Sequence, residues 1–123
     1  MLTAGTHETQ RVVDEIAAER KRQMWDEGWT PEHDDQHSRG EMVLAAMAYT
    51  QAATQVAMPV AAMRALPAPR YWPWDAAWWK PKDRRRNLVR AAALIVAEIE
   101  RLDRATVSRM AEKMPTLGTS AER

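Results

Sequence analysis

Three glutamates that lie far apart in the sequence, Glu19, Glu41 and Glu98, are the residues best suited to carry chemistry. Each falls on or at the edge of the apolar face of a segment with helical periodicity, so each should point toward a neighbouring helix. A carboxylate in apolar surroundings is unfavourable unless it is paired or bound to a metal. Oxygen ligands on facing helices can hold Mg²⁺ or Mn²⁺, which organise phosphates and activate a water molecule. The pattern therefore predicts that these three glutamates are catalytic.

Two more carboxylates extend this candidate metal site. Glu15 lies one turn before Glu19, and Asp35 lies just before the second predicted helix. The predicted metal ligands are Glu15, Glu19, Asp35, Glu41 and Glu98. A metal-free interpretation is also open, because Arg20 lies in the middle of the apolar arc of the first helix. In that interpretation Arg20 forms a buried ion pair with Glu41 or Glu98, or bends out to water.

Aromatic and cationic side chains supply the groups that hold a nucleotide. Tryptophan rings stack on bases, and arginine side chains neutralise phosphate charge through charge-assisted hydrogen bonds. The predicted ligand-binding residues are Arg20, Gln23, Trp29, Trp72, Trp74, Trp79, Arg84, Arg85 and Arg86. A structural role is the alternative for both groups, with the rings in a core and the arginines on a solvated face.

The two histidines His33 and His37 are four residues apart and would share one face of a helix. This spacing also occurs in transition-metal sites. The alternative is that Asp34 and Asp35 serve the turn and the cap of the next helix while the imidazoles are exposed. The sequence leaves the role of the histidines open.

Hydrophobic periodicity predicts three long helices, at about residues 9–25, from 38 to about 58, and from 83 to at least 103. A short helix capped by Thr30 should precede the second of them. Residues 59–82 are rich in proline and tryptophan and should be irregular. These elements must bring the candidate site residues together.

The expected fold is all-α, with three main helices in an antiparallel bundle and an irregular Trp/Pro-rich insertion before the last helix. Residues 1–113 should form a single helical domain, and residues 114–123 a flexible C-terminal tail. The second helix is apolar almost all round, which predicts a homodimer or a higher homo-oligomer.

Composition narrows the class of protein. The chain has 123 residues, a size that suits one domain, and its formal net charge of +1 argues against a surface that coats duplex nucleic acid. No cysteine is present, so disulfides and thiolate metal sites are excluded. No apolar run approaches the roughly 20 residues that span a bilayer. These features predict a cytoplasmic protein without membrane partners.

Several short motifs resemble those of a family of small proteins carried by bacteriophages and prophages. They are Glu19-Arg20-Lys21-Arg22-Gln23, Gly28-Trp29-Thr30-Pro31-Glu32-His33-Asp34-Asp35, Gly40-Glu41, Trp72-Pro73-Trp74, Trp79-Lys80-Pro81 and Ala97-Glu98-Ile99-Glu100-Arg101-Leu102-Asp103-Arg104. Such proteins look like distant relatives of the all-α nucleoside triphosphate pyrophosphohydrolases of the MazG type. The resemblance implies Mg²⁺-dependent cleavage of a nucleotide to its monophosphate and pyrophosphate. The chain departs from the MazG pattern Glu-Glu-x-x-Glu, because Glu19 follows Asp14-Glu15 one residue too late.

The leading prediction is therefore a nucleotide-handling phage accessory protein, a Mg²⁺-dependent pyrophosphohydrolase in the cytoplasm of a bacterial host. One alternative is a non-catalytic binder that sequesters a nucleotide or a nucleotide-derived immune signal, an anti-defence role. Another is a protein-interaction module that docks through its tryptophan-rich surface.

Overall fold

Two helices that pack along one another, α3 and α5, carry most of the core. The computed structural model describes residues 2–113, with side chains from residue 5 onward, and the predicted tail at residues 114–123 lies outside the described residues. The elements are α1 (Leu2–Asp26), α2 (Pro31–Asp35), α3 (Glu41–Ala53), α4 (Val60–Arg64), the 3₁₀ helix η1 (Ala76–Trp78) and α5 (Arg84–Lys113). The described residues contain no strand, so the predicted all-α class is confirmed.

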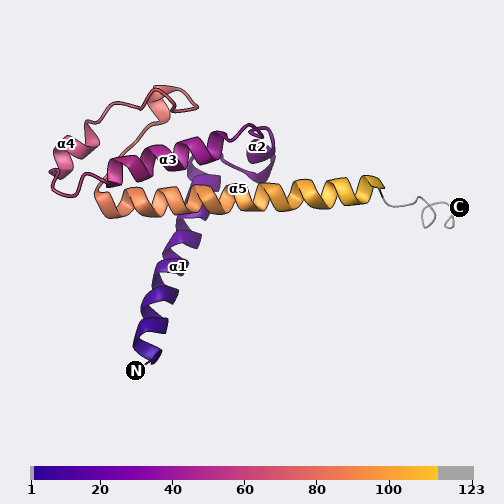
Figure 1. Cartoon of the computed structure of the whole chain (residues 1–123), viewed down its shortest axis with the longest axis horizontal. Helices are drawn as coiled ribbons and strands as arrows, with labels where there is room; N and C mark the ends of the chain where they lie inside the picture. The colour runs from indigo at the N-terminus through magenta and orange to yellow at the C-terminus, as the bar shows by residue number, and fades with distance from the viewer. Residues whose placement is uncertain (1, 114–123) are drawn as a thin grey trace, which may run out of the picture.

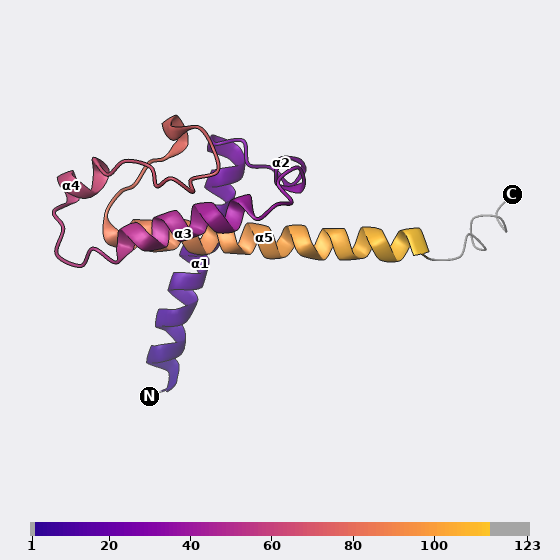
Figure 2. The same ribbon diagram turned by 45° about the horizontal axis from the view of Figure 1, so that its top comes forward.

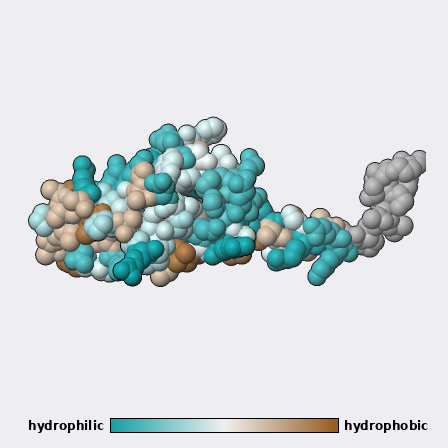
Figure 3. Space-filling view, turned by 90° about the horizontal axis from the view of Figure 1, so that it is seen from above, coloured by the Kyte–Doolittle hydropathy of each residue, from teal (hydrophilic) through white to brown (hydrophobic). Residues whose placement is uncertain are grey.

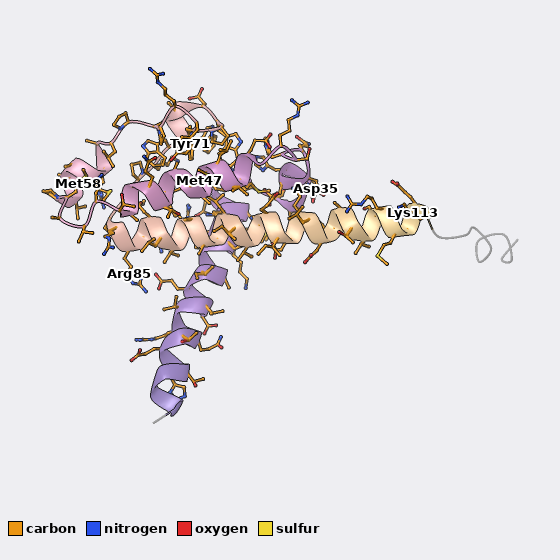
Figure 4. All side chains as sticks on the ribbon, viewed as in Figure 1. Asp35, Met47, Met58, Tyr71, Arg85 and Lys113 are labelled. Carbon is orange, nitrogen blue, oxygen red and sulfur yellow. The ribbon has the colours of Figure 1, made fainter. Side chains whose placement is uncertain are left out.

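The remaining long helix, α1, crosses the pair of helices α3 and α5 steeply instead of lying beside it. Both ribbon views show α3 running antiparallel to the first half of α5, with the N-terminal half of α1 pointing away (Figure 1, Figure 2). The arrangement of three helices side by side is therefore not confirmed. Polar pairs join α1 to α5, among them Glu19 with Arg86, and Val12 and Val13 on α1 are exposed. Figure 4 shows Arg85 on the side of α5 where α1 crosses, and Arg85 forms a bidentate ion pair with Glu15.

Local signals explain where the elements begin. The Thr30 hydroxyl caps α2 by accepting a hydrogen bond from the backbone N–H of His33, and Asp83 caps α5 by accepting one from Arg86. Both helices therefore begin as predicted. Gly40 has a φ of 84°, a left-handed conformation that glycine adopts without strain, and it separates α2 from α3.

The helix α3, predicted from residue 38 to about residue 58, is shorter than predicted. It begins at Glu41 and not at residue 38, and it ends at Ala53 instead of near residue 58. The Thr54 hydroxyl donates a hydrogen bond back to the carbonyl of Gln51, and the backbone N–H of Thr54 bonds the same carbonyl. Because Thr54 satisfies a terminal carbonyl in this way, the chain leaves the helix well before Pro59.

Small side chains on α3 allow it to lie close to α5. Ala45, Ala48 and Ala52 are buried, and they pack in one core cluster with Ala91 and Leu94 of α5. The tryptophan-rich segment, residues 65–83, folds over this pair and adds buried rings to the same cluster.

Surface polarity differs along the molecule. In the space-filling view, apolar residues gather at the end that carries α4, and hydrophilic residues dominate the middle (Figure 3). Among the described residues, no helix has the length and apolar character needed to cross a bilayer.

Candidate functional site

An aromatic pocket of about 340 Å³ lies between the end of α1, the α2 region and the tryptophan-rich segment. We call it the Trp pocket. Its lining residues are Glu27, Trp29, His33, His37, Trp74, Asp75 and Trp78. A second hollow of about 240 Å³ lies beside α3, but no charged side chain lines it. The Trp pocket therefore combines apolar walls with ionisable groups, a combination typical of ligand sites.

Neighbouring rings fix the walls of the Trp pocket. The centroids of Trp29 and Trp74 are 5.2 Å apart, and Trp74 also meets the buried ring of Trp72 edge to face at 5.5 Å. Such pairs contribute roughly 0.5–1.5 kcal/mol each beyond area burial. At the rim, the ammonium group of Lys80 lies 5.3 Å from the centroid of the partly exposed Trp78.

Two buried polar atoms of the pocket residues have no hydrogen-bond partner within the described part of the chain. They are the carboxylate oxygen Oε1 of Glu27 and the indole nitrogen Nε1 of Trp74. The other Glu27 oxygen accepts a hydrogen bond from Arg22 at 2.6 Å, while Lys80 Nζ stays 4.0 Å from Oε1. A buried polar group without a partner costs about 1–3 kcal/mol. One free acceptor and one free donor therefore belong to residues that line the same pocket.

The two histidines of the pocket contact each other. Their Nε2 atoms are 3.1 Å apart, and their ring centroids are 4.4 Å apart. The Nδ1 atom of His33 lies 3.1 Å from Asp34 Oδ1, and that of His37 lies 3.5 Å from Glu41 Oε2. Each imidazole thus has a carboxylate on its outer nitrogen and the other imidazole on its inner nitrogen.

Glu41 is held as an anion by its surroundings. Burial acts to raise the pKa of its carboxyl group, but hydrogen bonds from its own backbone N–H and from that of Arg39, together with His37, outweigh burial. The pKa of Glu41 is consequently below its usual range. This charge favours cations beside His37.

Glu19, the first predicted catalytic residue, is buried among arginines. Its carboxylate forms a bidentate pair with Arg22 at 2.8 and 2.9 Å and accepts a hydrogen bond from Arg86 at 2.8 Å. Burial would raise its pKa, yet the hydrogen bond from Arg22 and the charges of Arg22, Arg90 and Arg86 lower the pKa overall. Glu19 therefore already has its counter-charges within the chain.

The other predicted metal ligands are also paired one by one and do not converge. Glu98 forms a bidentate pair with Arg101 on the same helix, and Asp35 pairs with Arg104 across α2 and α5. Glu15 pairs with Arg85, which lowers its pKa, and Glu41 contacts His37 as described above. Among the described residues, no group of three or more His, Asp or Glu side chains is placed to hold a metal ion. This arrangement does not fit a Mg²⁺ ion held jointly by the five predicted ligands.

The predicted ion pair of Arg20 with Glu41 or Glu98 is wrong. Arg20 is buried, but its guanidinium pairs with Asp34 and Glu100 and donates to the carbonyl of Trp29, not to Glu41 or Glu98. The capped turn of α2 places Asp34 against α1, and Glu98 is already occupied by Arg101. Arg20 therefore holds α1, α2 and α5 together.

The remaining predicted ligand-binding residues are engaged in the fold. Trp72 and Trp79 are buried, and their indole N–H groups donate to backbone carbonyls. Arg84 donates to the carbonyl of Ala53. Gln23 is buried and donates to Glu19, although its Oε1 has no partner in the described part of the chain. Of the nine predicted ligand-binding residues, Trp29 and Trp74 line the Trp pocket.

Three residues of the Trp pocket, Glu27, Asp75 and Trp78, are not among the predicted site residues. Glu27 lies directly before Gly28, a position typical of the end of a helix, and its residue type alone does not indicate a site. Its pocket neighbour Trp74 is far away in the chain, and only the folding of the tryptophan-rich segment brings the two together. The proximity of Glu27 to Trp29 in the sequence was the one available signal.

No protein-family model, curated protein or solved structure matches this chain.

Proposed function

We propose that this protein binds a nucleotide, or a nucleotide-derived small molecule, with its base in the Trp pocket. The observation that carries the proposal is a pocket with tryptophan walls in which two lining residues, Glu27 and Trp74, have buried polar atoms without a hydrogen-bond partner in the described part of the chain. A nucleobase is a flat ring whose edge presents both N–H donors and acceptors. It therefore matches a site with one free acceptor, one free donor and aromatic faces.

The chemistry of recognition follows from these groups. Because both atoms are buried, the side chains of Glu27 and Trp74 must shift toward the ligand. An N–H group on the base edge then donates to Glu27, and a ring nitrogen or carbonyl oxygen accepts from Trp74. Stacking on a tryptophan face contributes roughly 1–3 kcal/mol for a base. Lys80, half exposed beside Trp78, supplies a cation for a phosphate at the rim.

Binding without turnover is the form of this function that the geometry supports best. The predicted catalytic glutamates Glu19 and Glu98 are neutralised by arginines of the chain, whereas Glu27 and Trp74 of the Trp pocket each keep one atom without a hydrogen-bond partner in the described part of the chain. We therefore favour a binder that sequesters its ligand over the predicted Mg²⁺-dependent pyrophosphohydrolase. Hydrolysis remains a prediction that the same experiment tests.

The experiment is a calorimetric and thermal-shift screen of nucleoside triphosphates and cyclic oligonucleotides, first in chelator and then with Mg²⁺. After each titration, the ligand is recovered by denaturing the protein and is identified by chromatography. The proposal predicts binding in chelator and recovery of the intact ligand. A ligand that is cleaved to monophosphate and pyrophosphate only when Mg²⁺ is present would favour the enzyme. The absence of a thermal shift with every nucleotide would favour the protein-interaction module.

Two substitutions locate the site. Glu27→Gln removes the charged acceptor, and Trp74→Phe removes the N–H donor while keeping an aromatic ring. A hydrogen bond that involves a charged group contributes about 1.5–3 kcal/mol, so Glu27→Gln should weaken binding roughly 10- to 100-fold. Trp25→Phe is the matched control, because Trp25 is 83% exposed and does not line the pocket. Equal losses in all three variants would contradict the assignment.

A further inference from the structure

The two imidazoles in the wall of the Trp pocket contact each other through their Nε2 atoms. The Nδ1 atoms of His33 and His37 each lie beside a carboxylate, that of Asp34 or Glu41. The Nε2 atoms lie 3.1 Å from each other. The two Nε2 atoms therefore lie together between the rings, and each ring has one carboxylate beside its outer nitrogen.

A carboxylate beside the Nδ1 atom of each ring favours the tautomer that carries its proton there. An imidazole that donates its Nδ1–H to a carboxylate has an unprotonated Nε2 with a free lone pair. With both rings oriented in this way, two lone pairs meet at 3.1 Å and repel each other. A cation between them, either a proton or a metal ion, removes the repulsion.

The separation of the two nitrogens suits a metal ion. Bonds from a zinc ion to imidazole nitrogen are about 2.0–2.1 Å long. Two such bonds to atoms 3.1 Å apart enclose an angle of roughly 100° at the ion. This angle lies between those of octahedral and tetrahedral coordination.

We propose that His33 and His37 bind one divalent transition-metal ion through their Nε2 atoms, with Asp34 and Glu41 orienting the rings. A carboxylate on the outer nitrogen is the usual support of a metal-binding histidine, because it fixes the tautomer and raises the basicity of the ligand. This site differs from the predicted Mg²⁺ site in its ligands, although Glu41 belongs to both. Imidazole nitrogen suits Zn²⁺, Ni²⁺, Cu²⁺ and Co²⁺.

Two protein ligands leave the other coordination positions of the ion to water or to a bound anion. Both histidines line the Trp pocket, so an ion between them lies at the pocket wall. Affinity should therefore be below that of a structural zinc site with four protein ligands. The inference does not depend on the nucleotide proposal, since the metal is tested in the absence of any nucleotide.

The first test is calorimetric titration of the full chain with CuCl₂, NiCl₂, CoCl₂ and MgCl₂ in a buffer without chelator. We expect one ion per chain, affinities in the order Cu²⁺ > Ni²⁺ > Co²⁺, and no competition from Mg²⁺. His33→Gln and His37→Gln should each weaken Ni²⁺ binding at least tenfold. His7→Gln is the matched control, because His7 is the third histidine of the chain and lies on α1, outside the Trp pocket.

A second measurement on the unmodified chain covers the case in which a histidine variant fails to fold. Long-range ¹H–¹⁵N spectra report the protonation of each ring nitrogen, and addition of Zn²⁺ should shift Nε2 of His33 and His37 while Nδ1 keeps its proton. Unchanged Nε2 signals would show that the two rings share only a proton. That result, or Ni²⁺ binding that is lost in His7→Gln instead, overturns the metal site.

Discussion

Removal of the Asp34 carboxylate should destabilise the protein strongly, because Asp34 is the buried partner of Arg20. The side chains of Asp34 and Arg20 are 1% and 5% exposed, and the carboxylate also accepts from His33 on the far side. Asp34→Ala leaves a guanidinium that is still charged, since arginine does not lose its proton in proteins. Its remaining partners are the carbonyl of Trp29 and the half-exposed Glu100.

The magnitude follows from what remains around Arg20. Breaking a buried ion pair by removing one partner costs about 3–5 kcal/mol. Glu100 is 50% exposed and contacts Arg20 at 3.2 Å, so it compensates in part. We therefore expect a loss near 3 kcal/mol in the free energy of unfolding. With a urea dependence of about 1–3 kcal/mol per molar, the unfolding midpoint should fall by roughly 1–3 M.

Urea unfolding followed by circular dichroism at neutral pH measures this loss. The matched control is Asp35→Ala, one residue further along α2, because Asp35 pairs with Arg104 where both side chains are substantially exposed. Exposed pairs contribute about 0–1 kcal/mol, so the control should shift the midpoint little. In an Arg20→Met background, Asp34→Ala should cost less than in the natural chain, since no buried cation remains. Equal midpoints for Asp34→Ala and Asp35→Ala would refute the reasoning.

Two further predictions concern acid stability and self-association. Because the pKa of Glu19 is lowered in the folded protein, its stabilisation is present above its ordinary value of 4.5 and is lost as the pH falls through the folded pKa. Glu19→Gln should therefore lower the unfolding free energy by about 1–3 kcal/mol at pH 7 and flatten its decline below pH 4.5 in urea titrations, and a decline as steep as in the natural chain would contradict this. The predicted homodimer could bury exposed apolar residues of α5, which are Leu88, Ile95, Ile99 and Leu102. Ile99→Glu should shift sedimentation toward the monomer without loss of thermal stability, and an unchanged dimer would exclude this face.

The local structure could be predicted where it depends on residues close in the sequence. The Thr30 cap of α2 and the Asp83 cap of α5 follow from the preference of these side chains for helix starts, and the structure confirms both. The pairing of Glu98 with Arg101 was also accessible, because residues three apart on a helix are neighbours. Glu98 is predicted to be a metal ligand because it lies in an apolar arc, but its counter-charge, Arg101, is one turn away on the same helix.

The arrangement of the helices and the site depended on contacts that local patterns do not encode. The pair Glu15–Arg85 joins residues far apart in the chain, and such pairs fix where α1 crosses α5. Periodicity shows which face of a helix is apolar but not the angle at which a polar face meets its neighbour. The Trp pocket likewise requires Glu27 and Trp74 to meet through an irregular segment, whose path proline residues alone do not define.

The distribution of the six tryptophans also gives the protein an optical readout of its own pocket. Trp25 is 83% exposed, whereas Trp29 and Trp74 are in a network of indole rings whose neighbouring centroids lie 5.2–5.5 Å apart. At such separations, excitation energy absorbed by one indole passes readily to the next. In a Trp25→Phe chain the ultraviolet emission would come from the remaining five rings, and a base stacked on either pocket tryptophan would quench the shared excitation. Ligand occupancy could then be followed by intensity alone, without an attached dye.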